Sequence, residues 1–449
     1  MSATAVSWQQ DLLSTRAVAE AAKAASRVLA ALDETARNAA LEAMAKAIEA
    51  ASKELLAANA VDCCADSCAE GESLSAAVLA RLKIDEAKLR EMAEQVRSVA
   101  TLPDPLGRML DAIELDEALN LTKISVPLGV LAVIFEARPD AVTQIAALAI
   151  KSGNAVILKP GKEVEHTAMV LVRVLREALV VAGLPADAIS LVVGRERAQE
   201  LLGMHGLVDL VIPRGSKALV EYVQANTRIP VLGHAEGVCH IFVDRSADEA
   251  LALRVIEDAK TDYPAACNAV ETVLVHREIA AEFLPKLAEH LRARGVTLHG
   301  DATVRGLLRG VEVEAVEDWH KEYGELALSL SVVESLDAAI DHIHAHGSLH
   351  TESILTEDTD AAERFLREVD AAGVFHNAST RFADGFRYGF GAEVGISTSK
   401  LHARGPVGLE GLTTYKYLLR GRGQIAGDYR SSNKPGTQAR VFTHKREAR

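Results

Sequence analysis

Cys267 is the residue of this 449-residue sequence best suited to act as a nucleophile. It lies in the segment KTDYPAACNAVETVLV, after a helical pattern that Pro264 interrupts and just before an apolar run typical of a strand. The small residues Ala265 and Ala266 would let a second molecule approach the turn. A thiol becomes a useful nucleophile when its pKa falls below about 8.5, the value of a free cysteine. A lone cysteine near a turn is more often structural, so both interpretations stay open at this level.

Two turns could bind an anion such as a phosphate. Gly215 and Ser216 in VIPRGSKALV follow a predicted strand and open a predicted helix, where free backbone N–H groups attract negative charge. Lys159 and Lys162 in VILKPGKEVEHT lie on either side of Gly161 at the end of another strand. An ordinary strand-to-helix turn and solvated lysines are equally good interpretations of these patterns.

Two arginines follow predicted strands and could recognise a carboxylate. Arg138 lies in FEARPD and Arg381 in NASTRF. A guanidinium group pairs with a carboxylate through two parallel hydrogen bonds, which suits an acidic small molecule. A surface salt bridge is the alternative for both.

Two clusters that resemble metal sites are better explained otherwise. In DHIHAHG the helical pattern ends before Gly347, so only His342 and His346 share a face and His344 does not; we expect a solvated helix end. Three cysteines lack the second ligand pair that a zinc site needs, and we expect reduced thiols without a role: Cys63, Cys64 and Cys68.

Short apolar strands alternate with helical patterns, which predicts parallel sheets covered on both faces. The first series of predicted strands is 129–135, 154–160, 189–194 and 207–213. A second α/β unit begins near residue 256, with strands at 269–275, 296–300, 352–356 and 373–380. This is a doubly wound, Rossmann-type α/β architecture, but the G-x-G-x-x-G fingerprint is absent, so a cofactor phosphate must be held differently. Two outlying extended segments, 114–126 and 411–419, suit a small sheet used in self-association.

Composition excludes several function classes. The chain has 49 Lys+Arg and 63 Asp+Glu, a net charge of −14, which argues against broad binding to nucleic acid. No apolar run approaches the roughly 18 residues of a membrane span, and the amino terminus lacks a secretory pattern. Five cysteines are too few for a disulfide scaffold of this size, so we expect a reducing, cytoplasmic location.

Several long motifs together resemble the γ-glutamyl phosphate reductase family of the aldehyde dehydrogenase superfamily. They occur in the same order over residues 10–420. Their sequences are especially similar to the reductase half of bifunctional pyrroline-5-carboxylate synthases, and we expect a stand-alone reductase because the kinase half is missing from this sequence. The motifs are VPLGVLAVIFEARPD, SGNAVILKPGKE, DLVIPRGS, VLGHAEGVCHIFVD, YPAACNAVETVLV, FHNASTRFADG and GAEVGISTSKLHARGPVGLEGLTTYK.

The resemblance implies an aldehyde dehydrogenase-like fold with three parts. We expect an NADP-binding domain at 1–255, with a ribbon at 114–128, a catalytic α/β domain at 256–405, an oligomerisation strand at 406–425 and a mobile tail at 430–449. It further implies roles for individual residues: Cys267 as the catalytic thiol; Lys159, Gly161, Lys162, Gly215, Ser216 and Glu325 for the cofactor; and Arg138, Asn377, Arg381, Ser397 and Thr398 for the substrate.

The sequence also departs from hydrolytic aldehyde dehydrogenases in two places. Their water-activating glutamate is replaced by the stretch Val231-Leu232-Gly233-His234, and the Pro-Trp-Asn loop that supplies their oxyanion asparagine is missing from FEARPD. An enzyme that must protect a thioester from water does not need the glutamate. The oxyanion donor is left open, with the backbone N–H of Cys267 and the side chain of Asn268 as candidates.

The expected reaction is the NADPH-dependent reduction of L-glutamyl 5-phosphate to glutamate 5-semialdehyde through a thioester on Cys267, a step of proline biosynthesis. We also expect a homo-oligomer, and contact with glutamate 5-kinase because the acyl phosphate is unstable; no nucleic-acid or membrane partner is expected. Two alternatives are an acylating dehydrogenase that uses a CoA thioester or aspartyl phosphate, and a non-catalytic protein that keeps the fold.

Overall fold

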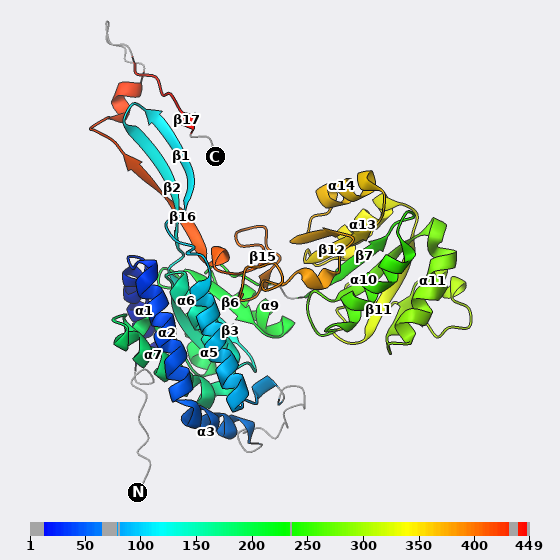
Figure 1. The fold of residues 1–449 in the computed structure, drawn as a ribbon, viewed down its shortest axis with the longest axis horizontal. Coiled ribbons are helices and arrows are strands. Elements are labelled where there is room, and N and C mark those ends of the chain that lie inside the picture. The colour runs from blue at the N-terminus through cyan, green and yellow to red at the C-terminus, as the bar shows by residue number, and fades with distance from the viewer. Residues whose placement is uncertain (1–12, 65–78, 80, 234–235, 431–438, 447–449) are drawn as a thin grey trace. The chain divides into compact units, whose positions relative to one another are not determined.

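A computed structural model describes residues 13–64, 79, 81–233, 236–430 and 439–446. The chain forms two compact units (Figure 1). The first comprises residues 1–213, 226–231 and 408–449, and the second comprises residues 214–225 and 232–407.

The first unit is built on a four-stranded sheet in the order β5-β4-β3-β6. Its strands are β3 (Val130–Phe135), β4 (Ala155–Pro160), β5 (Ile189–Leu191) and β6 (Leu210–Arg214). All six residues of β3 are buried, which explains its continuous apolar sequence, and it pairs in parallel with β4. The helices of this unit are α1 (Thr15–Leu29), α2 (Glu34–Ala50), α3 (Ser52–Cys63), α5 (Glu86–Thr101), α6 (Asp140–Lys151), α7 (Glu165–Val181) and α8 (Arg195–Leu202).

A separate antiparallel sheet extends from the first unit, in the order β16-β2-β1-β17 (Figure 1). Its strands are β1 (Met109–Asp116), β2 (Leu119–Pro127), β16 (Thr413–Arg420) and β17 (Lys445–Arg446). The pairing of β16 with β2 runs from Thr413 opposite Pro127 to Arg420 opposite Asn120. The two outlying segments predicted from sequence therefore do form one small sheet, and the first of them is a hairpin rather than a single ribbon.

The end of the chain differs from the mobile tail expected at 430–449. β17 pairs antiparallel with β1, and Arg440 forms an ion pair with Asp116 at 2.6 Å. The Asp116 carboxylate also accepts a hydrogen bond from the Tyr429 hydroxyl at 2.8 Å, and the Tyr429 ring stacks on Phe442. Residues 439–446 thus cover the outer edge of β1, which composition alone did not suggest.

The second unit contains a seven-stranded sheet in the order β10-β9-β11-β8-β7-β12-β13, with every pairing parallel. The strands are β7 (Cys239–Val243), β8 (Val270–His276), β9 (Thr297–Gly300), β10 (Glu314–Ala315), β11 (Ala327–Val333), β12 (Thr351–Leu355) and β13 (Gly373–His376). A short pair, β14 (Ile396–Ser397) and β15 (Gly405–Pro406), lies outside it. Because β7 pairs with both β8 and β12, the expected boundary at residue 255 falls inside this unit.

Helices cover both faces of this sheet, as a parallel sheet requires. One apolar core is formed with α10 (Glu249–Thr261), α11 (Arg277–Arg292) and α12 (Ala302–Leu307). The other core is formed with α13 (Leu336–His346) and α14 (Thr359–Glu368). The remaining helix is α9 (Lys217–Asn226). Within the part of the chain that the structure describes, no helix is both long and apolar enough to cross a membrane.

Candidate active site

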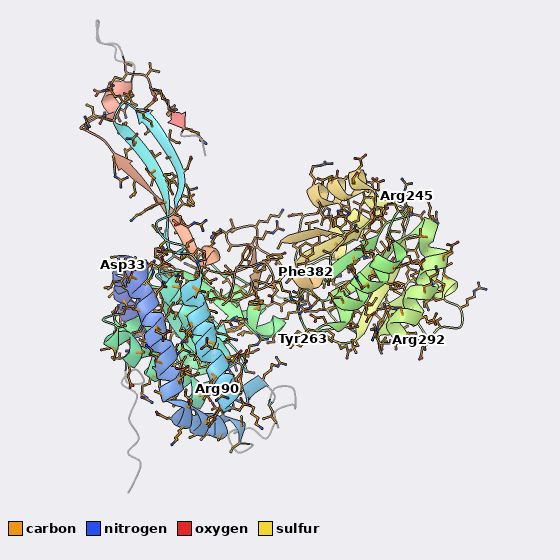
Figure 2. The ribbon with its side chains drawn as sticks, in the orientation of Figure 1. Asp33, Arg90, Arg245, Tyr263, Arg292 and Phe382 are labelled. Atoms are coloured by element: carbon orange, nitrogen blue, oxygen red, sulfur yellow. The ribbon has the colours of Figure 1, made fainter. Side chains whose placement is uncertain are left out.

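Cys267 lies in the loop between α10 and β8, directly before the amino end of β8. Two backbone hydrogen bonds form tight turns in this loop, from Ala266 N to Tyr263 O and from Ala269 N to Ala266 O. The thiol is partly buried, while Tyr263 (labelled in Figure 2) is 53% exposed. The loop that the sequence predicted holds Cys267 before the amino end of β8, a central strand of the sheet.

Gly237 packs directly against the backbone of Cys267. A Cβ atom at Gly237 would lie 2.0 Å from the carbonyl oxygen and 2.6 Å from the Cα of Cys267. The buried thiol of Cys239 donates to the same carbonyl oxygen at 3.4 Å, and Gly237 N donates to the Glu322 carboxylate at 3.0 Å. Gly237 thus contacts both the Glu322 carboxylate and the loop that carries Cys267.

The surroundings of Cys267 disfavour its thiolate in the free chain. Burial, together with the negative charges of Glu322 and Glu393, raises the pKa of Cys267 to about 12, and the positive charge of Arg381 opposes this shift. Burial also raises the pKa of Glu393 to about 7. Activation of the thiol therefore requires a change in the charges around it, such as protonation of a carboxyl group.

The side chain of Asn268 is bound within the chain. It is buried, and its amide nitrogen donates to the carbonyl oxygens of Ala383 at 3.0 Å and Arg381 at 3.5 Å. Its carbonyl oxygen accepts from Nη1 of Arg381. Of the two oxyanion donors left open by the sequence, the backbone N–H of Cys267 is therefore the better candidate.

Arg381 lies in the same cluster, where it holds the loop that carries Cys267. Its Nε pairs with the Asp262 carboxylate at 3.1 Å, and Asp262 also accepts from Arg387 at 2.9 Å. Arg381 is only 8% exposed. These contacts link the segment after β13 to both ends of the loop, so Arg381 has a structural task whether or not it also meets a substrate.

Asn377 is not close to Cys267. It follows the carboxyl end of β13, whereas Cys267 precedes the amino end of β8 in the same parallel sheet. Its amide oxygen accepts from Thr356 N and its amide nitrogen donates to Thr356 O, both at 2.9 Å. The other expected substrate residues of this unit are Ser397, which is fully buried in β14 and accepts from Ser399 N at 3.3 Å, and Thr398, which is half-buried.

The first unit carries the expected cofactor residues at the carboxyl end of β4. Lys159 is half-buried, which lowers the pKa of its amine, while Glu163 and Glu165 act in the opposite direction. Lys162 is exposed. A Cβ at Gly161 would lie 2.1 Å from the Glu163 carboxylate, so a larger residue here would require the Glu163 side chain to move.

Glu163 also fixes the start of the segment that contains Arg138. Its Oε1 accepts from Ala137 N at 2.5 Å, and Ala137 has a positive φ of 44°. Arg138 itself is exposed. The ends of β3 and β4 are thus joined through one carboxylate.

Gly215 and Ser216 lie where the sequence predicted, between β6 and α9, and both are exposed. The backbone carbonyl of Ser216 accepts from Val220 N at 3.2 Å, which closes the first turn of the helix. The strand-turn-helix prediction is confirmed. The phosphate-binding role remains a prediction.

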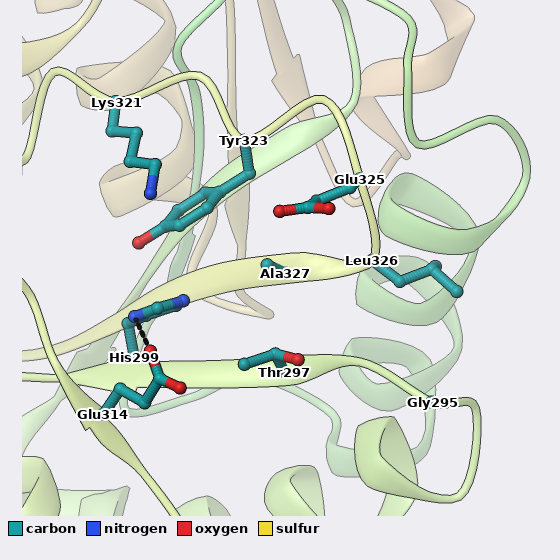
Figure 3. Close-up of a pocket in the computed structure, with 9 residues that line it drawn as sticks. All are labelled: Gly295, Thr297, His299, Glu314, Lys321, Tyr323, Glu325, Leu326 and Ala327. Atoms are coloured by element: carbon teal, nitrogen blue, oxygen red, sulfur yellow. Dashed lines mark ion pairs between the residues drawn. The ribbon is translucent and has the colours of Figure 1, made fainter. Parts of the chain in front are cut away.

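Glu325 lies in a pocket of about 450 Å³ at the amino ends of β9 and β11 (Figure 3). The pocket is lined by Gly295, Thr297, His299, Glu314, Lys321, Tyr323, Glu325, Leu326 and Ala327, and Cys267 is not among them. In the same irregular segment it is Glu322 that accepts a hydrogen bond from Gly237 N beside Cys267. Sequence reasoning missed Glu322, because the chain turns at Gly324, which has a positive φ of 64°, and no regular periodicity places these side chains.

The histidines of α13 differ from the expectation of a solvated helix end. The helix does end before Gly347, and His342 and His346 do share a face, with ring centroids 4.6 Å apart. His342 is however partly buried against Trp319 at 4.9 Å and against His240 at 5.5 Å. Sequence gave no sign that Trp319 would cover this face.

Among the residues that the structure describes, no group of three histidine, cysteine or acidic side chains could hold a metal ion. Cys63 is half-buried and Cys64 is exposed. Cys68 and His234, which entered the sequence predictions, lie outside the described residues.

Comparison with known proteins gives the family of the chain. A profile of the aldehyde dehydrogenase family matches residues 9–322. A γ-glutamyl phosphate reductase from Cyanothece sp. is 55% identical over 428 residues, which cover 95% of this chain and 97% of that protein. The chain belongs to the γ-glutamyl phosphate reductases of the aldehyde dehydrogenase family.

Solved structures agree with this assignment. The crystal structure of the γ-glutamyl phosphate reductase from Thermotoga maritima matches with a TM-score of 0.89 at 38% identity, over 92% of this chain and all of that one. The glyceraldehyde-3-phosphate dehydrogenase of Methanocaldococcus jannaschii, solved with NADP, shows the same fold at 16% identity, with a TM-score of 0.64 over 91% of this chain and 95% of that one. The aldehyde dehydrogenase fold expected from the sequence is therefore confirmed, and the chain is an oxidoreductase of this family.

Proposed function

We propose that the protein reduces L-glutamyl 5-phosphate to L-glutamate 5-semialdehyde with NADPH, through a thioester on Cys267. The observation that carries this proposal is the position of Cys267, partly buried at the amino end of β8 in a loop fixed by Gly237, Asn268 and Arg381. The family and the 55% identical relative support the substrate class.

In the first step the Cys267 sulfur bonds to the acyl carbon and the bond from that carbon to phosphate oxygen breaks. Phosphate is a good leaving group, so the step needs little acid assistance. The thiol proton must first be removed, and Glu393, whose carboxyl has a pKa of about 7, is the carboxyl group near the thiol best suited to accept it at neutral pH. The product is an acyl thioester on Cys267 and free phosphate.

The reductant would be held mainly by the first unit. Lys159 and Lys162 offer two cations at the end of β4, a donor set that suits the phosphate groups of NADP(H). When bound, NADPH supplies the hydride that reduces the thioester carbon. The backbone N–H of Cys267 would stabilise the negative charge on the carbonyl oxygen, and the carbon–sulfur bond then breaks to release the aldehyde.

The absence of a water-activating carboxylate from Val231-Leu232-Gly233 fits this chemistry. A thioester that waits for hydride is lost if water attacks it first. A reductase therefore benefits from a site in which no general base is directed at water.

The reverse reaction tests the proposal. Purified protein should reduce NADP⁺ with glutamate 5-semialdehyde only when phosphate is present, and Cys267→Ala should abolish this activity while its circular dichroism spectrum stays unchanged. Cys64→Ala, which removes an exposed thiol of the first unit, is the control and should remain active. A requirement for CoA in place of phosphate, or full activity of Cys267→Ala, would overturn the proposal.

A further inference from the structure

A fully buried ion pair joins the two arms of the loop that carries Cys267. Nζ of Lys260 lies 2.7 Å from Oε2 of Glu271, and neither side chain has any exposed surface. Lys260 belongs to the last turn of α10 and Glu271 is the second residue of β8. The pair therefore sets the separation between the end of the helix and the start of the strand, with Cys267 between them.

The same pair extends to the segment that contains Glu322. The second carboxylate oxygen of Glu271, Oε1, accepts from Gly324 N at 3.4 Å. Glu322, two residues earlier, accepts from Gly237 N, and Gly237 packs on Cys267. A closed ring of contacts thus connects Lys260, Glu271, the 322–324 segment, Gly237 and Cys267.

The ion pair is poorly explained as a source of stability. Burial raises the pKa of Glu271 to about 7 and lowers that of Lys260, which shows that removal from water opposes both charges. Apolar residues of similar volume often replace such a pair without loss of stability. Unlike an apolar contact, the ion pair is directional. The Glu271 carboxylate accepts hydrogen bonds from Lys260 and Gly324 and so fixes the positions of both.

We propose that Lys260 and Glu271 are positioning residues for the Cys267 thiol, which set its distance from the Glu322 carboxylate and hence its reactivity. The inference rests on the proposed function in assigning the nucleophile to Cys267. Glu271 touches no reacting atom in this scheme; it acts through the loop and through the 322–324 segment. Since shifts of about 1 Å at a reacting group change rates by about 100-fold, loosening this ring should be visible in the chemistry.

The test compares an apolar replacement of this pair with an apolar replacement of an ion pair in the first unit, in which Arg37 is buried and Asp104 is partly exposed. Lys260→Met combined with Glu271→Leu should give a folded protein in which kcat falls at least about tenfold while KM changes less than about threefold. The rate at which iodoacetamide alkylates Cys267, followed by mass spectrometry across pH 7–10.5, should also change. In the control, Arg37→Met with Asp104→Leu removes the 2.6 Å pair of the first unit and should change neither kcat nor the alkylation profile.

The alkylation readout needs no substrate, so it separates this inference from the proposed function. If the wild type fails to reduce the acyl phosphate, the proposed function is lost but the profile still reports on positioning. Should the double variant not fold, Glu271→Gln keeps the shape and the hydrogen bond to Gly324 and takes its place, with the same expected changes in kcat and alkylation. A folded variant that reacts and turns over like the wild type shows that the pair is only structural and overturns the inference.

Discussion

The Cα of Gly237 faces Cys267 so closely that the structure has no room for a Cβ atom, which would lie 2.0 Å from the Cys267 carbonyl oxygen. The atoms it would meet are backbone, so they cannot move aside as a flexible side chain would. Gly237 N also holds the Glu322 carboxylate. The reactive loop and a carboxylate beside it therefore depend on this single residue having no side chain.

Gly237→Ala should consequently displace Cys267 and lower kcat by about 100-fold, with a loss of about 1–3 kcal/mol in the free energy of unfolding. Steady-state kinetics and urea unfolding measure the two effects. Gly306→Ala is the matched control, because Gly306 lies in α12 with nothing within 4 Å of its Cβ position. That variant should keep wild-type kinetics and gain up to about 1 kcal/mol of stability. Equal kinetics in the two variants would show that the close contact does not position Cys267.

Much of the fold could be predicted because its strands are buried on both faces. β3 is a continuous apolar run and β4 is apolar up to Leu158, and such runs have few other stable arrangements than a covered parallel sheet. The boundary of the second unit was missed because β7 has the same composition as its neighbours in the sequence. Only its pairing with β8 and β12 assigns it to the seven-stranded sheet.

The sequence predicted the loop that carries the candidate nucleophile, but not the side chains that contact this loop. Cys267 is recognisable from its motif and from its place before a strand. Which carboxylate approaches it depends on the direction of side chains in the 321–326 segment, and this separates Glu322 from Glu325. Asn377 and Arg381 lie in one motif, and the sequence does not indicate that they have different surroundings. In the structure Asn377 binds Thr356, whereas Arg381 contacts Asn268 in the Cys267 loop.

The partly buried His342 predicts that the folded chain loses stability in acid. Burial and the neighbouring His240, His346 and His320 lower the pKa of His342 from 6.5 to about 3. His342 is thus neutral in the folded chain, whereas an unfolded chain binds a proton below pH 6.5, so stability is full above this pH and is lost as the pH falls toward 3. Between pH 7 and 5 this single group should cost about 2 kcal/mol.

Urea unfolding of the wild type and of His342→Phe at pH 7 and pH 5 measures this cost. The variant should lose less stability between the two pH values, because the group that takes up the proton is gone. His344→Phe, at an exposed position of the same helix, is the control and should behave like the wild type. The same pH dependence in wild type and His342→Phe would contradict the assignment.

Substitutions at Asn377 should separate two contributions to the free energy of unfolding, one from backbone strain and one from hydrogen bonds. It has a positive φ of 53°, and its amide pairs with both backbone groups of Thr356. Asn377→Ala loses these hydrogen bonds and keeps the unfavourable backbone, so the free energy of unfolding should fall by about 2–4 kcal/mol. Asn377→Gly loses the hydrogen bonds alone and should cost about 1 kcal/mol less than alanine, as measured by urea unfolding. If alanine and glycine cost the same, the strained backbone makes no contribution.

Glu322 should control the reactivity of the Cys267 thiol. Because the pKa of Cys267 is about 12 in the free chain, its alkylation rate should rise about tenfold per pH unit from pH 7 to above pH 10. Glu322→Gln removes a nearby negative charge and keeps an oxygen that can accept from Gly237 N, so the pKa of the thiol should fall and alkylation at pH 8 should be several-fold faster. Glu325→Gln changes a carboxylate of the separate pocket and should leave the rate unchanged. Iodoacetamide labelling of the peptide that contains Cys267 distinguishes the two, and a faster rate in Glu325→Gln but not in Glu322→Gln would show that the wrong carboxylate has been assigned to the thiol.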